Sequence, residues 1–320
     1  MIRMELSIVI PVFNENLVIP ELFMRITGLI EELKSRHGIS SREIEIILVN
    51  DGSKDNSLAL LIDLARQNPA FKVINLSKNF GHQIAATAGI EYATGNAVVL
   101  IDADLQDPPE VILDLYAKHK EGYDVVYAVR KQRDGESRFK LLTAKLFYRL
   151  MRAMTSINIP LDTGDFRIMG RNVVNVFKSM QEKHRFIRGM ITWVGFSQTG
   201  LYYERKERFA GQSKYPLVKM VRFAWDAITS FSTIPLRLVS YLGFGVAFLG
   251  FLYSIYVVYL KLFTNATVSG WSSVMIVILL MSGINLITLG VIGEYIGRIS
   301  EESKNRPLYI IEKIYGNEDR

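Results

Sequence analysis

The first half of the chain alternates short apolar segments with longer amphipathic ones. Val, Ile and Leu dominate the short segments, as is typical of strands buried on both faces of a parallel sheet. Such segments lie at 6–12, 44–49, 72–76 and 97–101. Between them, the spacing of apolar positions predicts helices at about 17–34, 57–67 and 82–93. Strands that alternate with helices indicate βαβ units with right-handed crossovers, so we expect an α/β domain.

Polar residues follow three of these strands directly. Asn14 and Glu15 come after the first, Asp51 after the second, and Asp102 and Asp104 after the fourth. Ligands of such sheets bind beyond the carboxyl ends of the strands. The pattern therefore predicts a binding site at this edge of the sheet.

The last third of the chain contains two long apolar runs. Between 235 and 260 the only charged residue is Arg237, and between 271 and 293 there is none. Each run exceeds the roughly 20 residues that cross a hydrocarbon core of ~30 Å. Tyrosines in the first run and Trp271 in the second suit the membrane interface. The runs predict two transmembrane helices; the alternative is two buried helices of a soluble domain.

Charge around these runs predicts their orientation. Basic residues flank the pair on both outer sides, whereas the connecting segment 261–270 carries one Lys. By the positive-inside rule both ends are cytoplasmic and the connection lies outside. The first residues lack the apolar core of a signal peptide, which also favours a cytoplasmic location for the N-terminal part of the chain. We expect an integral protein of a bacterial-type inner membrane.

The segment 214–231 is amphipathic and precedes the first apolar run. We interpret this segment as a helix that lies in the membrane interface. The alternative is a helix that packs on the globular domain. Four regions are thus expected along the chain: a cytoplasmic catalytic domain at 1–212, juxtamembrane helices at 213–233, a transmembrane pair at 234–297 (helices at about 235–260 and 271–295), and a cytoplasmic tail at 298–320.

Composition adds two exclusions. The 320 residues include no cysteine, which excludes disulfides, thiolate metal sites and cysteine nucleophiles. The net charge of +6 suits anionic lipid headgroups, nucleotides or nucleic acid. The soluble half shows no basic stripe with interleaved aromatic residues, so nucleic acid is not an expected partner.

Asp102 and Asp104 carry the chemistry most directly. Two carboxylates at i and i+2 after a strand can both face a cleft, and hard cations take carboxylate and phosphate oxygens together. Such a cation neutralises charge on a departing diphosphate. For Asp51 and Gly52 the structural alternative is a turn with a helix cap at Ser53 or Asp55.

Six ordered motifs connect these residues to a known family. They lie at 10–15, 49–53, 79–82, 102–110, 164–167 and 213–216. With them, residues 7–232 resemble family 2 glycosyltransferases of the GT-A fold, specifically the polyprenyl-phosphate glycosyltransferases. That group includes dolichyl-phosphate mannose synthases and GtrB-type bactoprenol glucosyltransferases. The two apolar runs are similar to the GtrB branch in particular.

The resemblance implies a role for each matching residue. Nucleotide-sugar binding is implied for Pro11, Phe13, Asn14, Glu15, Asn50, Asp51, Asp102 and Ala103. A bound Mg²⁺ or Mn²⁺ is implied at Asp104 and Gln106. Catalytic roles are implied for Asp165, Asp104 and Arg208. The acceptor phosphate is expected near Arg130, Arg133, Ser137, Ser213 and Lys214.

Several of these roles have alternatives. Asp165 matches a proposed general base, but a phosphate acceptor is already an anion near pH 7, so orienting a substrate is the other interpretation. A helix cap or a salt bridge to Arg167 is the structural one. The 130–138 cluster could be a solvated basic loop. Asn50 and Gln212 depart from the usual family residues, Asp and Glu.

The expected reaction is an inverting, metal-dependent transfer of a hexose to undecaprenyl or another polyprenyl phosphate, with UDP-glucose as the favoured donor. The first alternative is a mannosyltransferase that uses GDP-mannose. An alternative of another class is a non-catalytic membrane scaffold or flippase subunit with a degenerate transferase domain. A homo-oligomer is expected. His82 is interpreted as loop structure or a donor contact, because no Ser or Cys nucleophile adjoins it.

Overall fold

The computed structural model describes residues 4–131, 163–205, 234–263 and 270–316. It divides into a sheet domain, which includes the segment from Pro307 onward, and a helical unit that includes Arg222–Arg306. The amphipathic segment expected at 213–233 lies outside the described residues. Each unit is considered separately below.

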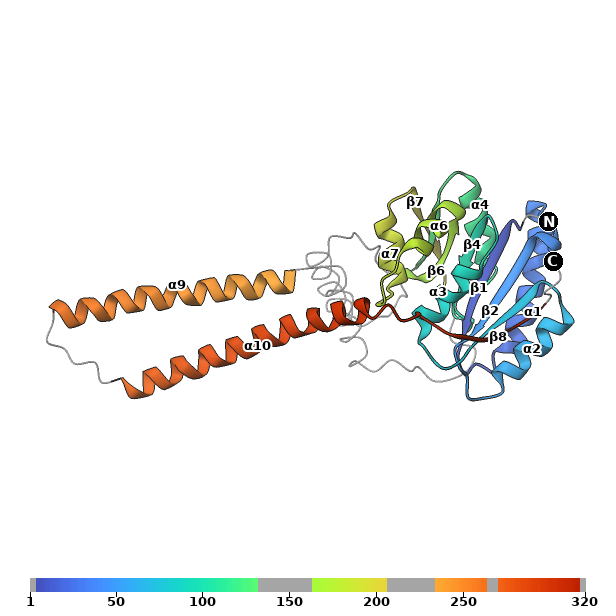
Figure 1. Cartoon of the computed structure of the whole chain (residues 1–320). Coiled ribbons are helices and arrows are strands. Elements are labelled where there is room, and N and C mark those ends of the chain that lie inside the picture. The colour runs from blue at the N-terminus through green and yellow to red at the C-terminus, as the bar shows by residue number, and fades with distance from the viewer. Residues whose placement is uncertain (1–3, 132–162, 206–233, 264–269, 317–320) are drawn as a thin grey trace. The chain divides into compact units, whose positions relative to one another are not determined.

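The sheet domain is built on one mixed sheet (Figure 1). Its strands in the described residues are β1 (Leu6–Val12), β2 (Ile44–Asn50), β3 (Phe71–Leu76), β4 (Ala97–Leu100), β5 (Val125–Arg130), β6 (Thr163–Gly170), β7 (Gln198–Tyr203) and β8 (Ile311–Tyr315). Their order across the sheet is β7-β5-β6-β4-β1-β2-β3-β8. The four central strands β4, β1, β2 and β3 are parallel, whereas β6 and β8 run antiparallel to their neighbours β4 and β3.

Helices cover both faces of this sheet, as βαβ units require. The helices are α1 (Ile19–His37), α2 (Ser57–Gln67), α3 (His82–Tyr92), α4 (Val111–Lys120), α6 (Arg171–Ser179) and α7 (Ile187–Val194), and a short 3-10 turn, η1 (Ser41–Glu43), precedes β2. Helices α1, α2 and α4 pack on one face, and α3, α6 and α7 on the other. The four strands and three helices expected from the pattern all form, within a few residues of the expected bounds.

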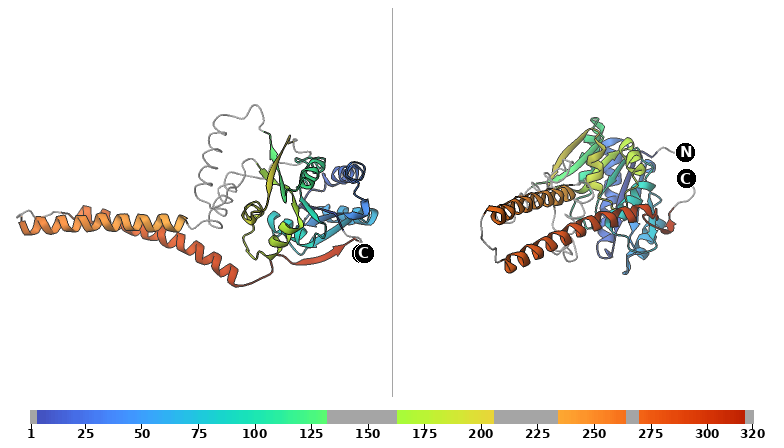
Figure 2. Two further views of the ribbon diagram at one scale, coloured as in Figure 1. Left: turned by 90° about the horizontal axis from the view of Figure 1, so that it is seen from above. Right: turned by 60° about the vertical axis from the view of Figure 1, so that its left-hand side comes forward.

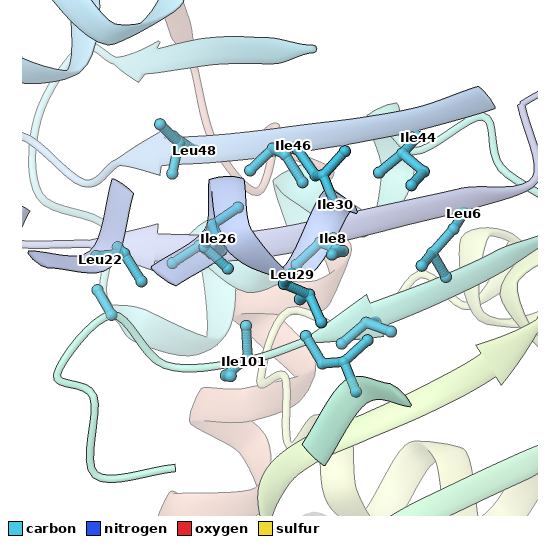
Figure 3. Packing of buried hydrophobic residues seen from close by; sticks show 14 of the residues in the cluster. Leu6, Ile8, Leu22, Ile26, Leu29, Ile30, Ile44, Ile46, Leu48 and Ile101 are labelled. Carbon is cyan, nitrogen blue, oxygen red and sulfur yellow. The ribbon is translucent and has the colours of Figure 1, made fainter. Parts of the chain in front are cut away.

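Helix α1 shows how the sequence pattern becomes core. Its apolar residues recur at helical spacing and point at β1 and β2 (Figure 3). Leu22, Ile26 and Leu33 are each at most 3% exposed. Burial of one such side chain stabilises the fold by about 1.5–3 kcal/mol. The helix ends at Gly38, whose φ of 68° places it in the left-handed region that a glycine cap accepts.

The second unit contains two long helices, α9 (Ile234–Phe263) and α10 (Trp271–Ser303). Segments of both are long and apolar enough to cross a membrane, and those segments are not buried within the protein. Phe244 and Leu286, for example, are 76% and 70% exposed. Among the described residues, neither segment is part of a buried core, which disfavours the alternative of two buried helices of a soluble domain.

The segment after α10 differs from the expected tail at 298–320. Helix α10 continues to Ser303, and β8 then pairs antiparallel with β3 at the edge of the sheet (Figures 1 and 2). The pattern did not indicate this strand, because Glu312 and Lys313 interrupt its apolar residues. An edge strand tolerates such charges, since one side of it faces solvent.

Candidate active site

The loops after β1, β2 and β4 lie side by side because of the sheet register. Val12 pairs with Asn50 across β1 and β2, and Val9 pairs with Leu100 across β1 and β4. The polar residues after each strand are therefore brought to one edge of the sheet, as expected.

Side-chain hydrogen bonds tie the first two loops together. The backbone N–H of Asn14 donates to Oγ of Ser53 at 3.0 Å, and Oδ1 of Asn14 accepts from the N–H of Lys54 at 2.8 Å. The N–H of Glu15 donates to Oγ of Ser57 at 3.0 Å. Asn14 itself has a φ of 54°, a left-handed conformation that Asn tolerates better than most residues. Pro11 ends up inside β1, and Phe13 is 37% exposed at the start of the loop.

Asp51 orders the loop after β3. Its carboxylate is 2% exposed and accepts from the N–H of Phe80 at 2.7 Å, the N–H of Gly81 at 3.0 Å and Nδ2 of Asn79 at 3.0 Å. Burial raises its pKa, although the bonds from Phe80 and Gly81 oppose the rise. Gly52 has the left-handed backbone that the expected turn needs: its φ is 64°, and a Cβ there would lie 2.5 Å from the backbone N of Asn79. The helix cap expected at Ser53 or Asp55 lies elsewhere, because the N-cap position of α2 is Asn56. Nucleotide binding by Asp51 stays a prediction.

Four carboxylates gather after β4 and on β6. Burial raises the pKa of Asp102 to about 6; His82 opposes this rise, and the charges of Asp165, Asp107 and Asp104 add to it. Within the described part of the chain, Oδ1 of Asp102 is buried and receives no hydrogen bond. Leu105, between Asp104 and Gln106, holds a φ of 57°, which is uncommon for a branched residue and typical of functional loops.

This cluster fits a divalent cation. No group of three or more His, Asp or Glu among the described residues is arranged to hold an ion. A Mg²⁺ ion bound together with a diphosphate needs only one or two carboxylates, because the phosphate oxygens supply other ligands. Asp102 and Asp104 could supply those carboxylates. Oε1 of Gln106 accepts a hydrogen bond from Arg205, and its role in holding the ion stays a prediction.

His82, at the first position of α3, lies between two of these carboxylates. Its Nε2 is 3.3 Å from Oδ1 of Asp102 and 3.7 Å from Oδ2 of Asp165. Burial alone would lower its pKa, but Asp102, Asp165 and Asp51 outweigh burial and raise the pKa to about 9. His82 is thus a cation that partly offsets the carboxylate cluster, which goes beyond the loop role expected for it.

Asp165 is held from three directions. Nε2 of Gln83 donates to its Oδ2 at 2.8 Å, Arg188 Nη2 lies 3.5 Å from its Oδ1, and His82 approaches as described. Burial alone would raise the pKa of Asp165, but Arg188, His82 and Arg167 hold it far below its usual range. Arg167 makes no bond to this carboxylate; it donates instead to the backbone carbonyls of Gly164 and Asp165.

A second cluster surrounds Asp107, which is 1% exposed. Its carboxylate accepts from the hydroxyl of Tyr203 and lies 3.6 Å from Nη2 of Arg130 and 3.5 Å from Nε of Arg205. Although burial opposes it, Asp107 raises the pKa of Arg130. Arg130, which is 30% exposed, therefore belongs to a partly buried ion-pair network around Asp107, and the solvated-loop interpretation does not hold for this residue.

The structure brings some of the predicted site residues together. Asn14, Asp51, Asp102, Asp104 and Asp165 meet at or near one edge of the sheet. Arg133, Ser137, Arg208, Ser213 and Lys214 lie outside the described residues. Gln83, Arg188 and Asp107 were missed as partners. Two features of the sequence could have indicated them: Gln83 adjoins His82, and Arg188 is a charged residue near the start of an otherwise apolar helix.

Comparison with known proteins decides the family. Residues 7–177 match the model of glycosyl transferase family 2. The chain belongs to glycosyl transferase family 2. Residues 234–299 match the GtrB C-terminal hairpin, so the resemblance of the apolar runs to the GtrB branch is confirmed. The family also confirms the GT-A-like fold and the enzyme class, a glycosyltransferase.

Several family 2 relatives match the chain over nearly its whole length. The uncharacterized glycosyltransferase YkcC of Bacillus subtilis is 54% identical, with 99% of this chain and 96% of the relative covered. The bactoprenol glucosyl transferase of Shigella phage SfII is 42% identical, with 97% and 98% covered. The prophage bactoprenol glucosyl transferase homolog of Escherichia coli is 41% identical, with 97% and 99% covered.

Matches among solved structures are more distant in sequence. The mannosyltransferase PcManGT of Pyrobaculum calidifontis, in complex with GDP-Man and Mn²⁺, is 15% identical, with a TM-score of 0.46 and coverage of 72% of this chain and 71% of that chain.

Proposed function

We propose that this glycosyltransferase transfers glucose from UDP-glucose to a polyprenyl phosphate such as undecaprenyl phosphate at the cytoplasmic face of a membrane. One observation carries the proposal: a carboxylate cluster suited to a nucleotide diphosphate stands in the same chain as a GtrB-type hairpin. Full-length relatives named bactoprenol glucosyl transferase support the acceptor and the sugar. The product is a polyprenyl-monophosphate sugar.

The reaction is a single in-line displacement with inversion. A phosphate oxygen of the acceptor attacks the anomeric carbon, and the bond from that carbon to the diphosphate breaks, so that the nucleoside diphosphate leaves with the electron pair. The acceptor needs no deprotonation near pH 7, because it is already an anion. The principal task of the protein is to place two anionic groups in line.

The geometry favours Asp165 as a positioning carboxylate. A good general base has a pKa near the working pH, whereas the pKa of Asp165 is held far below its usual range by Arg188, His82 and Arg167, against burial. Gln83 and Arg188 fix both carboxylate oxygens. Asp165 is therefore a fixed, ionised acceptor of hydrogen bonds that can orient sugar hydroxyls.

Charge neutralisation is divided between metal and protein. A Mg²⁺ or Mn²⁺ ion held by Asp104 and Gln106, with the carboxylate of Asp102 beside it, would offset the charge that develops on the leaving diphosphate. His82 supplies a further positive charge beside Asp102. Arg208 and the acceptor residues are proposed to face the two phosphates, since Arg and Lys offset their mutual repulsion. The acceptor residues are Arg130, Arg133, Ser137, Ser213 and Lys214.

Chain connectivity supports the proposed topology. Strand β8 follows α10 in sequence and pairs with β3 in the catalytic sheet. If α9 and α10 each cross the membrane, the chain returns to the side that it left. The catalytic domain and both ends of the hairpin then share one side, and the flanking basic residues favour the cytoplasm as that side. A homo-oligomer remains part of the proposal, to be tested by the mass of the detergent-solubilised protein.

Sugar transfer into extractable lipid tests the function. Purified protein would receive undecaprenyl phosphate, Mg²⁺ or Mn²⁺ and radiolabelled UDP-glucose, with UDP-galactose and GDP-mannose in parallel. We expect label in the lipid phase from UDP-glucose, loss of it with EDTA, and at least a 100-fold loss in Asp104→Ala. The matched control is Glu31→Gln, an exposed carboxylate on α1.

The parallel donors decide between the alternatives. Label from GDP-mannose alone would identify a mannosyltransferase. Nucleotide binding without label from any donor would favour the scaffold or flippase subunit over the enzyme.

A further inference from the structure

A row of polar side chains runs from the C-terminal strand into the proposed nucleotide site. Nδ2 of Asn75 on β3 donates to Oε2 of Glu312 on β8 at 2.8 Å. Nδ2 of Asn50, the last residue of β2, donates to Oδ1 of Asn75 at 2.7 Å. Oδ1 of Asn50 accepts from the N–H of Ser53 at 3.3 Å, and Ser53 in turn accepts from the N–H of Asn14. We name the first three residues, Asn50, Asn75 and Glu312, the amide ladder.

The direction of every bond in the amide ladder follows from Glu312. An ionised carboxylate only accepts hydrogen bonds, whereas an Asn amide can rotate to present either oxygen or nitrogen. Glu312 therefore turns the nitrogen of Asn75 toward β8 and its oxygen toward Asn50. Asn50 must then present its nitrogen to Asn75 and its oxygen to Ser53. Asn50 and Asn75 are 1% and 4% exposed, so a wrong orientation would leave buried polar atoms unpaired.

A bulge in the backbone of β8 directs the side chain of Glu312 toward Asn75. Asn75 pairs with Lys313 and Leu76 pairs with Ile311, so Glu312 is the extra residue of a β-bulge. Bulges re-aim the side chain of the extra residue. Two further bonds fix the strand entry: the N–H of Ser77 donates to the carbonyl of Ile310 at 2.9 Å, and the hydroxyl of Tyr309 donates to Glu91 at 2.6 Å.

We propose that Glu312 is a positioning residue for the donor nucleotide. Through the amide ladder it sets the orientation of Asn50 and of the loop that begins at Asp51, next to the Asn14 loop. This inference rests on the proposed function, since it takes that edge of the sheet as the nucleotide site. It makes the segment after the membrane hairpin a working part of the donor site.

A carboxylate at position 50 distinguishes the positioning role of Glu312 from a role in strand pairing alone. In Asn50→Asp, the new carboxylate can only accept, so Asn75 must turn its nitrogen toward β2. Its oxygen then faces the carboxylate of Glu312, which is repulsive. Changing Glu312→Gln in the same chain removes the conflict, because the Gln amide can donate to the turned Asn75. A role in strand pairing alone predicts no such rescue.

The test is calorimetric binding of UDP, and in parallel GDP, to the full-length protein in detergent with Mg²⁺. We expect Asn50→Asp to weaken binding about 10-fold or more and Glu312→Ala about 3- to 10-fold, since each leaves buried polar groups mismatched. The double variant Asn50→Asp with Glu312→Gln should return to within about 3-fold of the wild type, on the same grounds. Glu31→Gln on α1 serves as the matched carboxylate control.

The outcomes separate the two proposals. If the wild type binds a nucleotide and the double variant binds no better than Asn50→Asp, the positioning role is overturned while the proposed function stands. If the wild type binds neither UDP nor GDP, the proposed function fails and the positioning role fails with it. Rescue in the double variant, with wild-type binding in Glu31→Gln, supports the role.

Discussion

Asp165 and Glu5 are two carboxylates that the fold keeps ionised by different means. Asp165 lies in the candidate site beside Arg188, His82 and Gln83. Glu5 lies at the opposite end of the sheet, before β1, and accepts from Asn96 at 2.6 Å, Tyr116 at 2.7 Å and Lys120 at 2.9 Å. We expect Asp165 to act in the reaction and Glu5 to stabilise the fold. Replacing each carboxylate should therefore have different consequences.

Replacing Arg188 tests the positioning role of Asp165. In Arg188→Gln the pKa of Asp165 rises and its Oδ1 loses the charged partner, so we expect kcat for lipid transfer to fall about 10- to 100-fold, with donor KM within about 3-fold. Arg188→Lys should recover part of the loss. Steady-state kinetics with UDP-glucose, and Arg36→Gln on exposed α1 as control, provide the measurement. An unchanged or raised kcat in Arg188→Gln would instead favour Asp165 as a base.

Glu5 should contribute stability that depends on pH. Burial opposes ionisation, but hydrogen bonds from Lys120, Asn96 and Tyr116 lower the pKa of Glu5 from 4.5 to about 2. A group with a lowered folded pKa stabilises above its unfolded pKa, and this contribution disappears as pH falls from about 4.5 to about 2. A full shift of this size corresponds to roughly 3 kcal/mol.

Partial exposure, 24% for Glu5 and 58% for Lys120, reduces the expected contribution of Glu5 to about 1–2 kcal/mol. Glu5→Gln should therefore lower the free energy of unfolding of the sheet domain by that amount at pH 7. The difference from wild type should shrink below pH 4.5 and nearly vanish only at about pH 2. Denaturant unfolding at a series of pH values measures it; a difference that is constant with pH would contradict the assignment.

At the scale of elements, α3 is seated unusually close to the sheet. A Cβ built on Gly89 would lie 2.2 Å from Cγ1 of Val9 and 3.0 Å from Cγ2 of Val49. Residue 89 is thus glycine because β1 and β2 leave no room for a side chain. The same helix begins with His82 and Gln83, so its seating also sets the distance from those side chains to Asp165.

Gly89→Ala should therefore destabilise the domain by about 1–3 kcal/mol, the usual cost of overpacking. It should also lower transfer activity, because α3 must shift away from β1. Gly28→Ala in α1 is the matched control: nothing lies within 4 Å of a Cβ there, and replacing a helical glycine in open space should stabilise by about 0.5–1 kcal/mol. Thermal unfolding of both variants checks the opposite signs; equal shifts would refute the packing argument.

At the scale of the whole molecule, the absence of cysteine makes the proposed topology directly measurable. Single cysteines would be placed at Asn265, between the two apolar runs, and at Ser303, the last residue of α10. A membrane-impermeant maleimide should label Asn265→Cys in intact cells and Ser303→Cys only after the membrane is opened. Labelling of both in intact cells, or of neither, would contradict a two-span hairpin with cytoplasmic ends.

The sequence by itself determined the elements whose signals are local. Unbroken apolar runs specified the buried parallel strands and the two long apolar helices, because burial or lipid contact demands the same residue types along the whole segment. Asp51, Asp102 and Asp104 could be placed at one edge, since the carboxyl ends of parallel strands meet there.

Tertiary structure alone decided which side chains those residues meet. Asp165 pairs with Arg188 and Gln83, and Arg130 with Asp107, because hydrogen bonds between distant segments depend on how helices pack on the sheet. Strand β8 carries no clear pattern of its own, and its place beside β3 comes from edge pairing and a bulge. The link from Glu312 to Asn50 exists only because the chain returns, after its two apolar helices, to the sheet where it began.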